Sequence, residues 1–143
     1  MHKSHNFTIL FGYFRYIILA MTILEAIARM EGFYQEGSRA QRNNNPGNIN
    51  WGEFASKHGA TGPETLKNGG AGRFAHFPDE ATGFAAMKSL LQSSGYKGLT
   101  IRQCLNRYAP PADGNDASVY EKSVCGWLRC LPTDIIDSFV EAA

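Results

Sequence analysis

A long segment without helical periodicity is the feature that most constrains this chain. Residues 36–72 are rich in Asn, Gly and Pro, and they include Asn43-Asn-Asn-Pro-Gly-Asn48 and Gly69-Gly-Ala-Gly72. A loop of this length is uncommon inside a compact domain unless it has a function. We therefore expect a functional, irregular segment here, followed by a short strand where Arg73-Phe-Ala-His-Phe77 alternates between polar and apolar residues.

Helix signals stand on both sides of this segment. Thr22-Ile-Leu-Glu25 forms a capping box, and the apolar spacing that follows predicts a helix to about Glu31, with a stop at Gly32. The pattern as a whole predicts a mainly α domain of the α+β kind, in which an irregular loop and short-strand segment separates the first and second helices. Further helices are expected to start at Pro78-Asp-Glu-Ala81, at Thr100, at Asp116 or Ser118, and at Thr133.

The composition fits one globular domain. The chain has 143 residues, of which 43% are apolar, and its formal charge is +1 with Lys and Arg scattered along the sequence, so we expect no nucleic-acid partner. Cys104, Cys125 and Cys130 are odd in number and lack zinc-site spacing, and residues 125 and 130 are poorly placed for a disulfide along a helix, so all three are expected to be thiols. No metal or nucleotide motif is visible, so no cofactor is expected.

Residues 1–20 form a separate question. Residues 7–20 are apolar apart from Arg15, follow a weakly basic start at Lys3, and are too short for a comfortable membrane span. Three interpretations are open: a signal peptide or signal anchor, an additional amphipathic helix, or a non-native extension upstream of a true start at Met21. The interruption at Arg15 and the helix start that follows favour the extension. We therefore separate residues 1–20 from one domain over residues 21–143.

Glu31 is the strongest candidate for a chemical role. It lies four residues after Ile27 and seven after Leu24, so the helix directs its carboxyl group toward the apolar face. Burial and the negative end of the helix dipole both favour the protonated form and raise the pKa. A carboxyl group that is protonated near neutral pH can act as a general acid at a glycosidic oxygen. The structural alternative is an ion pair with a nearby arginine, namely Arg29, Arg39 or Arg42.

Four motifs follow one another along residues 22 to about 128. They are Ile27-Ala-Arg-Met-Glu31-Gly-Phe33; Arg42-Asn-Asn-Asn-Pro-Gly-Asn48-Ile49; Gly72-Arg-Phe-Ala-His-Phe77 with Gly83 downstream; and Tyr108-Ala-Pro-Pro followed by Asn115-Asp116 and Tyr120. In this order they resemble segments of the lysozyme-like lytic transglycosylases and of bacteriophage virion-associated peptidoglycan-degrading proteins. The resemblance implies a mostly helical, lysozyme-like catalytic domain over residues 21–143, with a glycan groove between two lobes.

The resemblance also implies a reaction, cleavage of peptidoglycan between MurNAc and GlcNAc without a cofactor. Glu31 would protonate the glycosidic oxygen and then accept the proton of the MurNAc 6-hydroxyl, which closes a 1,6-anhydro ring. It further implies substrate-binding roles for Asn48, Phe77, Tyr108 and Tyr120. The residues themselves also allow structural roles, because Asn45-Pro-Gly-Asn48 has the composition of a turn and either tyrosine could belong to the core.

The sequence departs from the family pattern at two places and leaves alternatives open. Gly32 stands where Ser is commoner, and residues 72–77 replace the usual Gly-Leu-Met-Gln segment. The alternatives are a hydrolytic muramidase (endolysin), a non-catalytic peptidoglycan-binding or virion structural module, and a glycosidase for another N-acetylhexosamine polymer such as chitin. A muramidase would need a second acid, for which Glu36, Glu53, Asp79 and Glu80 are available.

The resemblance also indicates where and with what the protein acts. The expected partners are peptidoglycan glycan strands and components of a phage virion or tail. The expected location is the cell envelope (periplasm) or a phage virion, with the protein acting as a monomer.

Overall fold

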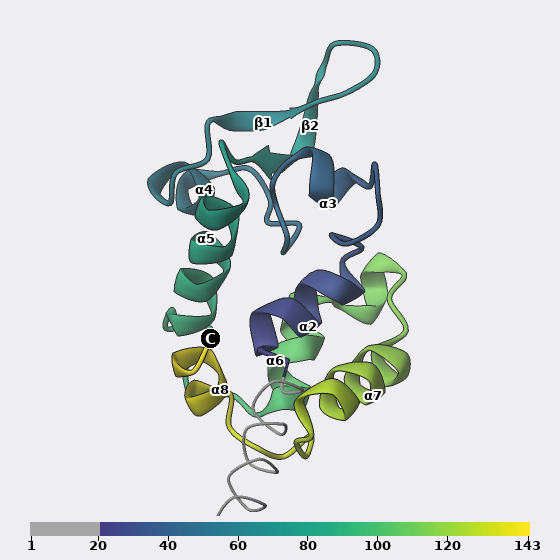
Figure 1. Ribbon diagram of the computed structural model, residues 1–143, viewed down its shortest axis with the longest axis vertical. Helices are drawn as coiled ribbons and strands as arrows, with labels where there is room; N and C mark the ends of the chain where they lie inside the picture. Colours follow the sequence, from purple (N-terminus) through teal and green to yellow (C-terminus); the bar gives the residue numbers. More distant parts are fainter. Residues whose placement is uncertain (1–20) are drawn as a thin grey trace, which may run out of the picture.

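Helices are the main regular structure in the computed structural model, which describes residues 21–143 (Figure 1). A small antiparallel sheet lies among them, so the domain is of the mixed α+β kind. As expected, the strands lie between the first and second long helices, but this segment also contains two short helices that the sequence did not predict. The described elements are α2 (Ile23–Met30), α3 (Arg39–Arg42), α4 (Glu53–Lys57), β1 (Gly62–Thr65), β2 (Ala71–His76), α5 (Glu80–Gln92), α6 (Ile101–Tyr108), the 3-10 helix η1 (Pro111–Asp113), α7 (Ala117–Leu128) and α8 (Asp137–Glu141).

Residues 1–20, for which the sequence left three interpretations open, lie outside the described residues. Within residues 21–143, no helix has both the length and the apolar character that a membrane crossing requires. The same residues contain no group of three or more His, Cys, Asp or Glu side chains placed to hold a metal ion.

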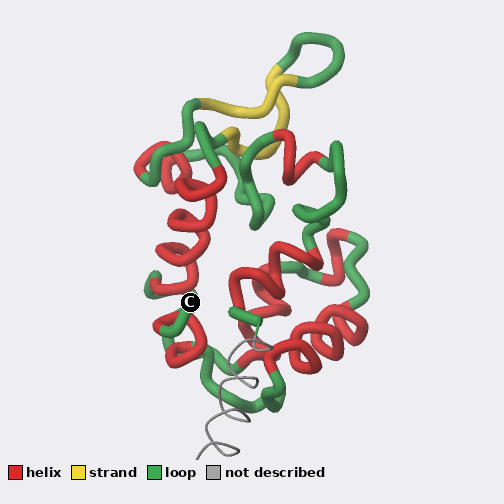
Figure 2. Tube along the Cα trace, viewed as in Figure 1, coloured by secondary structure: helices red, strands yellow, loops and turns green. Residues whose placement is uncertain are grey.

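The elements form two parts that α5 connects along one side (Figure 1). One part contains the β1–β2 hairpin together with α3 and α4, and the other contains α2, α6, α7 and α8. The hairpin stands at the far end of the molecule from the C-terminus, as the colouring by secondary structure in Figure 2 also shows. Lys88 of α5 contacts the C-terminal residue, where its Nζ donates to the Ala143 carbonyl at 2.5 Å.

The sheet connects the Asn-rich loop to the hairpin. β1 and β2 pair antiparallel, with Gly62 opposite His76. Along the other edge of β2, the Ala75 N–H donates to the Ile49 carbonyl at 2.9 Å, and Asn50 and Phe74 form an isolated bridge. The strand predicted at residues 73–77 therefore exists, with its start two residues earlier and its end one residue earlier.

Three of the predicted helix starts, at Thr22, Thr100 and Asp116, are confirmed by their side-chain caps. Thr22 and Thr100 both form capping boxes, with Glu25 and Gln103 as the reciprocal partners. Asp116, rather than Ser118, caps α7, and its carboxylate accepts from two backbone N–H groups at 3.1 Å. Each cap satisfies backbone donors that the first helical turn leaves without an internal partner.

The predicted start of the last helix at Thr133 is wrong, because α8 begins only at Asp137. The segment before α8 instead forms hydrogen bonds with the start of α6. The N–H groups of Ile101 and Arg102 donate to the carbonyls of Asp134 and Pro132 at 2.8 and 3.0 Å. The first N–H groups of α6, which have no acceptor within the helix, thus find acceptors in the segment that the sequence predicted to be helical.

The Asn43–Asn48 loop is packed inside the molecule, and its side chains form hydrogen bonds with the backbone groups around it. Asn45 is fully buried, and its amide donates to the carbonyls of Ile49 and Ala75 and accepts from the Ile49 N–H, all at 2.9 Å. Helix α5 approaches the loop so closely that a Cβ on Gly83 would lie 2.1 Å from the Asn44 carbonyl oxygen. Only glycine leaves room for this contact.

Replacement of Gly83 by alanine is therefore expected to destabilise the fold by about 1–3 kcal/mol, because the new methyl group meets rigid backbone. Gly126 in α7 is the matched control, since a Cβ there meets nothing within 4 Å. Gly126→Ala should stabilise the protein by about 0.5–1 kcal/mol through helix propensity. Urea unfolding of the two variants measures both effects, and two changes of the same sign would contradict the contact at Gly83.

Candidate active site

Glu31 ends helix α2 at the point where the chain turns sharply. Its N–H still donates to the Ile27 carbonyl at 2.9 Å, while Gly32 adopts φ +80°, which glycine reaches without steric cost. The Phe33 N–H then donates back to the Ala28 carbonyl at 3.0 Å, and the Phe33 ring is buried. This closed helix end fixes the position from which the Glu31 side chain extends.

Two neutral donors hold the Glu31 carboxylate. The Asn48 amide nitrogen donates to Oε2 at 3.0 Å and to the Glu31 carbonyl at 3.2 Å. The Tyr120 hydroxyl donates to Oε1 at 3.1 Å. Asn48 comes from the Asn-rich loop and Tyr120 from α7, so three segments distant in sequence meet at this carboxyl group.

The surroundings raise the pKa of Glu31 above its ordinary value of 4.5. Burial is the largest cause because it penalises the charged form, and the hydrogen bonds from Asn48 and Tyr120 act in the opposite direction. Burial and the negative charge of Glu31 also raise the pKa of Tyr120, so its hydroxyl keeps its proton and remains a donor. The expected direction of the Glu31 shift is thus confirmed.

The arginines that could have paired with Glu31 have other partners. Arg29 lies over the Trp127 ring, 5.3 Å from its centroid. Arg39 forms an ion pair with Glu64 at 3.3 Å, and Arg42 donates to the Gly37 carbonyl. These contacts argue against the alternative in which Glu31 forms an ion pair with a nearby arginine.

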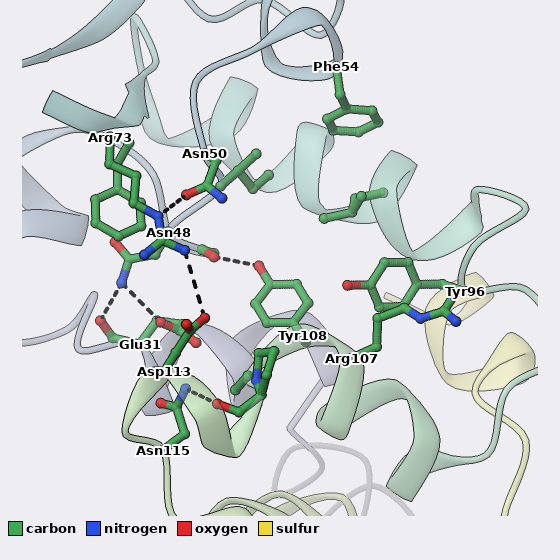
Figure 3. Close-up of a pocket in the computed structure, with 16 residues that line it drawn as sticks. Glu31, Asn48, Asn50, Phe54, Arg73, Tyr96, Arg107, Tyr108, Asp113 and Asn115 are labelled. Atoms are coloured by element: carbon green, nitrogen blue, oxygen red, sulfur yellow. Dashed lines mark hydrogen bonds and ion pairs between the residues drawn. The ribbon is translucent and has the colours of Figure 1, made fainter. Parts of the chain in front are cut away.

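Glu31 lies in the wall of a pocket of about 540 Å³ that 16 residues line (Figure 3). One wall comes from the loop and hairpin part and carries Asn50, Phe54 and Arg73. The opposite wall comes from α6 and the chain that follows it, which supplies Tyr108. The pocket therefore lies between the two parts of the molecule.

An ion pair joins the two walls. Arg73 of β2 approaches Asp113 of η1 with 3.8 Å between Nη2 and Oδ2, and both side chains are more than half exposed. Asn50 orients Arg73 by accepting from its Nε at 3.0 Å. Figure 3 shows these three side chains on the Glu31 side of the pocket. Because the pair is exposed, it contributes little to stability and can open at small cost.

The predicted substrate-binding residues have different positions. Asn48 and Tyr108 line the pocket, and the Tyr108 hydroxyl donates to the Gly47 carbonyl at 2.5 Å. Tyr120 is buried behind Glu31 and supports the carboxylate rather than presenting a ring to a ligand. Phe77 has no exposed surface and belongs to the hydrophobic core, so the prediction that its side chain binds substrate is wrong.

Asn48 has two further unusual features. Its backbone lies in the left-handed region at φ +46°, and its Oδ1 is buried without a hydrogen-bond partner among the described residues. The conformation turns the amide nitrogen toward Glu31, where it makes both of its hydrogen bonds. Asn tolerates this backbone region better than other non-glycine residues, which accounts for the residue type at this position.

Sequence reasoning missed Asp113, the other carboxylate among the residues that line the pocket. The acids considered for a second catalytic role lie elsewhere: Glu36 is exposed, Glu53 pairs with Lys57 at 2.6 Å, and Asp79 caps α5. Glu80 begins α5 and is exposed. Asp113 sits in a short irregular stretch after Pro110-Pro111, where no periodicity or motif marks it as a site residue.

Comparison with known proteins adds no family to this description. No protein-family model matches the chain, and no curated protein matches it.

Replacement of Tyr120 by phenylalanine should raise the pKa of Glu31 further. The substitution keeps the ring and removes a donor that favours the ionised carboxylate. Carbon-13 NMR titration of the glutamate carboxyl groups measures the change. Tyr34→Phe is the control, because Tyr34 is 51% exposed and its ring packs against Phe33. An unchanged or lower Glu31 pKa in Tyr120→Phe would show that the hydroxyl does not support the carboxylate.

Proposed function

We propose that this protein is a lysozyme-like peptidoglycan lytic transglycosylase in which Glu31 acts first as general acid and then as general base. One observation carries the proposal: a desolvated carboxyl group with a raised pKa lies in the wall of a polar and aromatic pocket, held by two neutral donors. Perturbed carboxyl groups in pockets are candidates for acid and base catalysis. The sequence resemblance at residues 27–33 names the same residue independently.

The reaction follows from the two protonation states of Glu31. The protonated carboxyl group gives its proton to the glycosidic oxygen, the bond from that oxygen to the MurNAc C1 breaks, and an oxocarbenium-like centre develops. The carboxylate then takes the proton of the MurNAc 6-hydroxyl as O6 bonds to C1. The products are a 1,6-anhydro-MurNAc end and a free GlcNAc hydroxyl, and Glu31 regains its proton. No water molecule is consumed.

Asn48 and Tyr120 serve both halves of this cycle. Burial favours the proton on Glu31 before the reaction, and the two donors stabilise the carboxylate that remains after the proton has left. Because neither donor carries a charge, neither abolishes the raised pKa. An arginine in either place would hold Glu31 ionised at neutral pH and remove the general acid.

The pocket walls have the chemistry that an amino-sugar polymer needs. Phe54, Phe74 and Tyr96 offer flat apolar faces, and Asn50 and Asn115 offer amides that can pair with N-acetyl and hydroxyl groups. The proposal includes action at the bacterial cell envelope or from a phage virion, in keeping with the resemblance. A non-catalytic binding module would need the same walls but not the desolvated acid.

A hydrolytic muramidase is the second candidate, and Asp113 favours it. This carboxylate lines the same pocket as Glu31, and inverting or retaining glycosidases place two carboxyl groups around the scissile bond. We prefer the transglycosylase because Asp113 is exposed and paired with Arg73, and because the transglycosylase reaction needs no second carboxyl group.

Glu31→Gln is expected to abolish the release of muropeptides from purified sacculi, because an amide can neither give nor take the proton. Mass spectrometry of the wild-type digest should show anhydro-muropeptides. The release by the wild type should fall as the pH rises through the raised pKa of Glu31, since the acid form is then lost. Glu36→Gln, which changes an exposed acid five positions later, should retain full activity.

Several outcomes would contradict the proposal. Reducing-end products from the wild type would indicate a hydrolase. Equal sacculus binding by the wild type and by Glu31→Gln, with release from neither, would indicate a binding module. Chitin oligomers offered alongside sacculi test the remaining alternative, because their preferential cleavage would place the substrate outside peptidoglycan.

Asp113→Asn separates the transglycosylase from the muramidase. For a transglycosylase we expect anhydro products at a rate within about tenfold of the wild type, whereas loss of a general base typically costs about 10²–10⁴-fold. Glu53→Gln, an acid that is paired with Lys57 and does not line the pocket, is the control. A loss of more than about a hundredfold in Asp113→Asn alone would assign Asp113 to the chemistry.

A further inference from the structure

The C-terminal end of α7 brings two cysteines together. The helix ends at Leu128, and Arg129 then adopts a left-handed conformation with φ 54° and ψ 47°. The Cys130 N–H donates back to the Cys125 carbonyl at 3.1 Å, which is the 6→1 hydrogen bond of a Schellman motif. Such a motif commonly places the side chains of its two end residues against each other, and here both are cysteines.

This geometry changes the expectation drawn from the sequence. Along a continuous helix, residues 125 and 130 would be about 7.5 Å apart in rise and on different faces. The left-handed turn at Arg129 instead folds the chain back over the last helical turn. The backbone bond from Cys130 to Cys125 brings the two residues together at the end of the helix, and both side chains are half-buried.

We propose that Cys125 and Cys130 form a disulfide that closes the C-terminal cap of α7 when the protein meets an oxidising thiol–disulfide partner, and that Cys104 takes no part. Cys104 is a buried core residue with no exposed surface, which denies a partner access to it. The proposal does not depend on the proposed glycan-cleaving activity. It applies to any compartment in which small-molecule or protein disulfides are available.

The reaction proceeds by two thiol–disulfide exchanges. A Cys125 thiolate attacks one sulfur of the partner disulfide and releases one partner thiolate. The Cys130 thiolate then attacks the mixed disulfide at Cys125 and releases the second. The two cysteine thiols are oxidised, the partner disulfide is reduced to two thiols, and two protons pass from the cysteines to the released sulfurs.

The order of attack follows from the environment of each thiol. Burial is the largest cause of a raised pKa at both thiols, and it raises the pKa of Cys130 further, to about 12. Cys125 therefore forms a thiolate more readily and is the first nucleophile. The raised pKa values also mean that oxidation is slow at neutral pH and faster in alkaline buffer.

The test is oxidation of the full chain by glutathione disulfide at about pH 8.5, compared with a sample kept in dithiothreitol. Both samples are then denatured, alkylated and weighed by mass spectrometry. The reduced protein should take up three alkyl groups, one for each cysteine, and the oxidised protein one, at Cys104. Peptide mapping should locate the bond between residues 125 and 130, and the melting temperature should rise by about 5 °C, as expected for closure of a short loop.

Single variants test the mechanism. Cys130→Ser should accumulate a glutathione adduct at Cys125, Cys125→Ser should accumulate little adduct, and Cys104→Ser should oxidise like the wild type. Three alkylatable thiols after prolonged exposure to glutathione disulfide would overturn the proposal, as would a bond to Cys104 or between two chains.

Discussion

A buried loop must satisfy its backbone groups without the help of regular secondary structure, and the architecture around Glu31 depends on how the Asn-rich loop does this. Asn45 makes three hydrogen bonds to the backbone of Ile49 and Ala75, and Asn44 donates to the Phe77 carbonyl. These bonds attach the loop to β2 and leave Asn48 facing the end of α2. Loss of that attachment would remove a wall of the pocket together with a donor to Glu31.

The site follows from a balance of opposed effects on one carboxyl group. Burial favours the protonated form of Glu31, while Asn48 and Tyr120 favour the ionised form, and the sum is a raised pKa. A general acid that must later act as a base needs such a balance, since a fully apolar site would prevent ionisation and a cationic partner would enforce it. Neutral donors satisfy both requirements. The choice of an amide and a phenol around Glu31 is therefore chemically consistent with the proposed two-step role.

Local signals in the sequence predicted local structure well. Thr22, Thr100 and Asp116 start the helices that their side chains predicted, because a cap depends on only four or five neighbouring residues. The start predicted at Thr133 is wrong because the carbonyls on either side of it accept hydrogen bonds from the first turn of α6, a tertiary contact that no local pattern records. Glu31 could be found from sequence because its helix directs it toward the apolar face and ends at it. Its partner Tyr120, 89 residues away, was recovered only through resemblance, and its role changed from sugar contact to support of the acid.

The contacts between opposite walls of the pocket could not be predicted from the sequence. Arg73 and Asp113 meet only because β2 and η1, which belong to different parts of the molecule, approach each other across the pocket. Phe77 shows the converse: an aromatic residue at the end of a predicted strand was assigned to the substrate, yet its side chain is buried in the core. The end of α7 adds a third case. The spacing of Cys125 and Cys130 is unfavourable for a disulfide along a helix, but the left-handed conformation of Arg129 brings the two residues together. In each case a change of chain direction decides which side chains meet, and such changes depend on packing that the linear pattern does not contain.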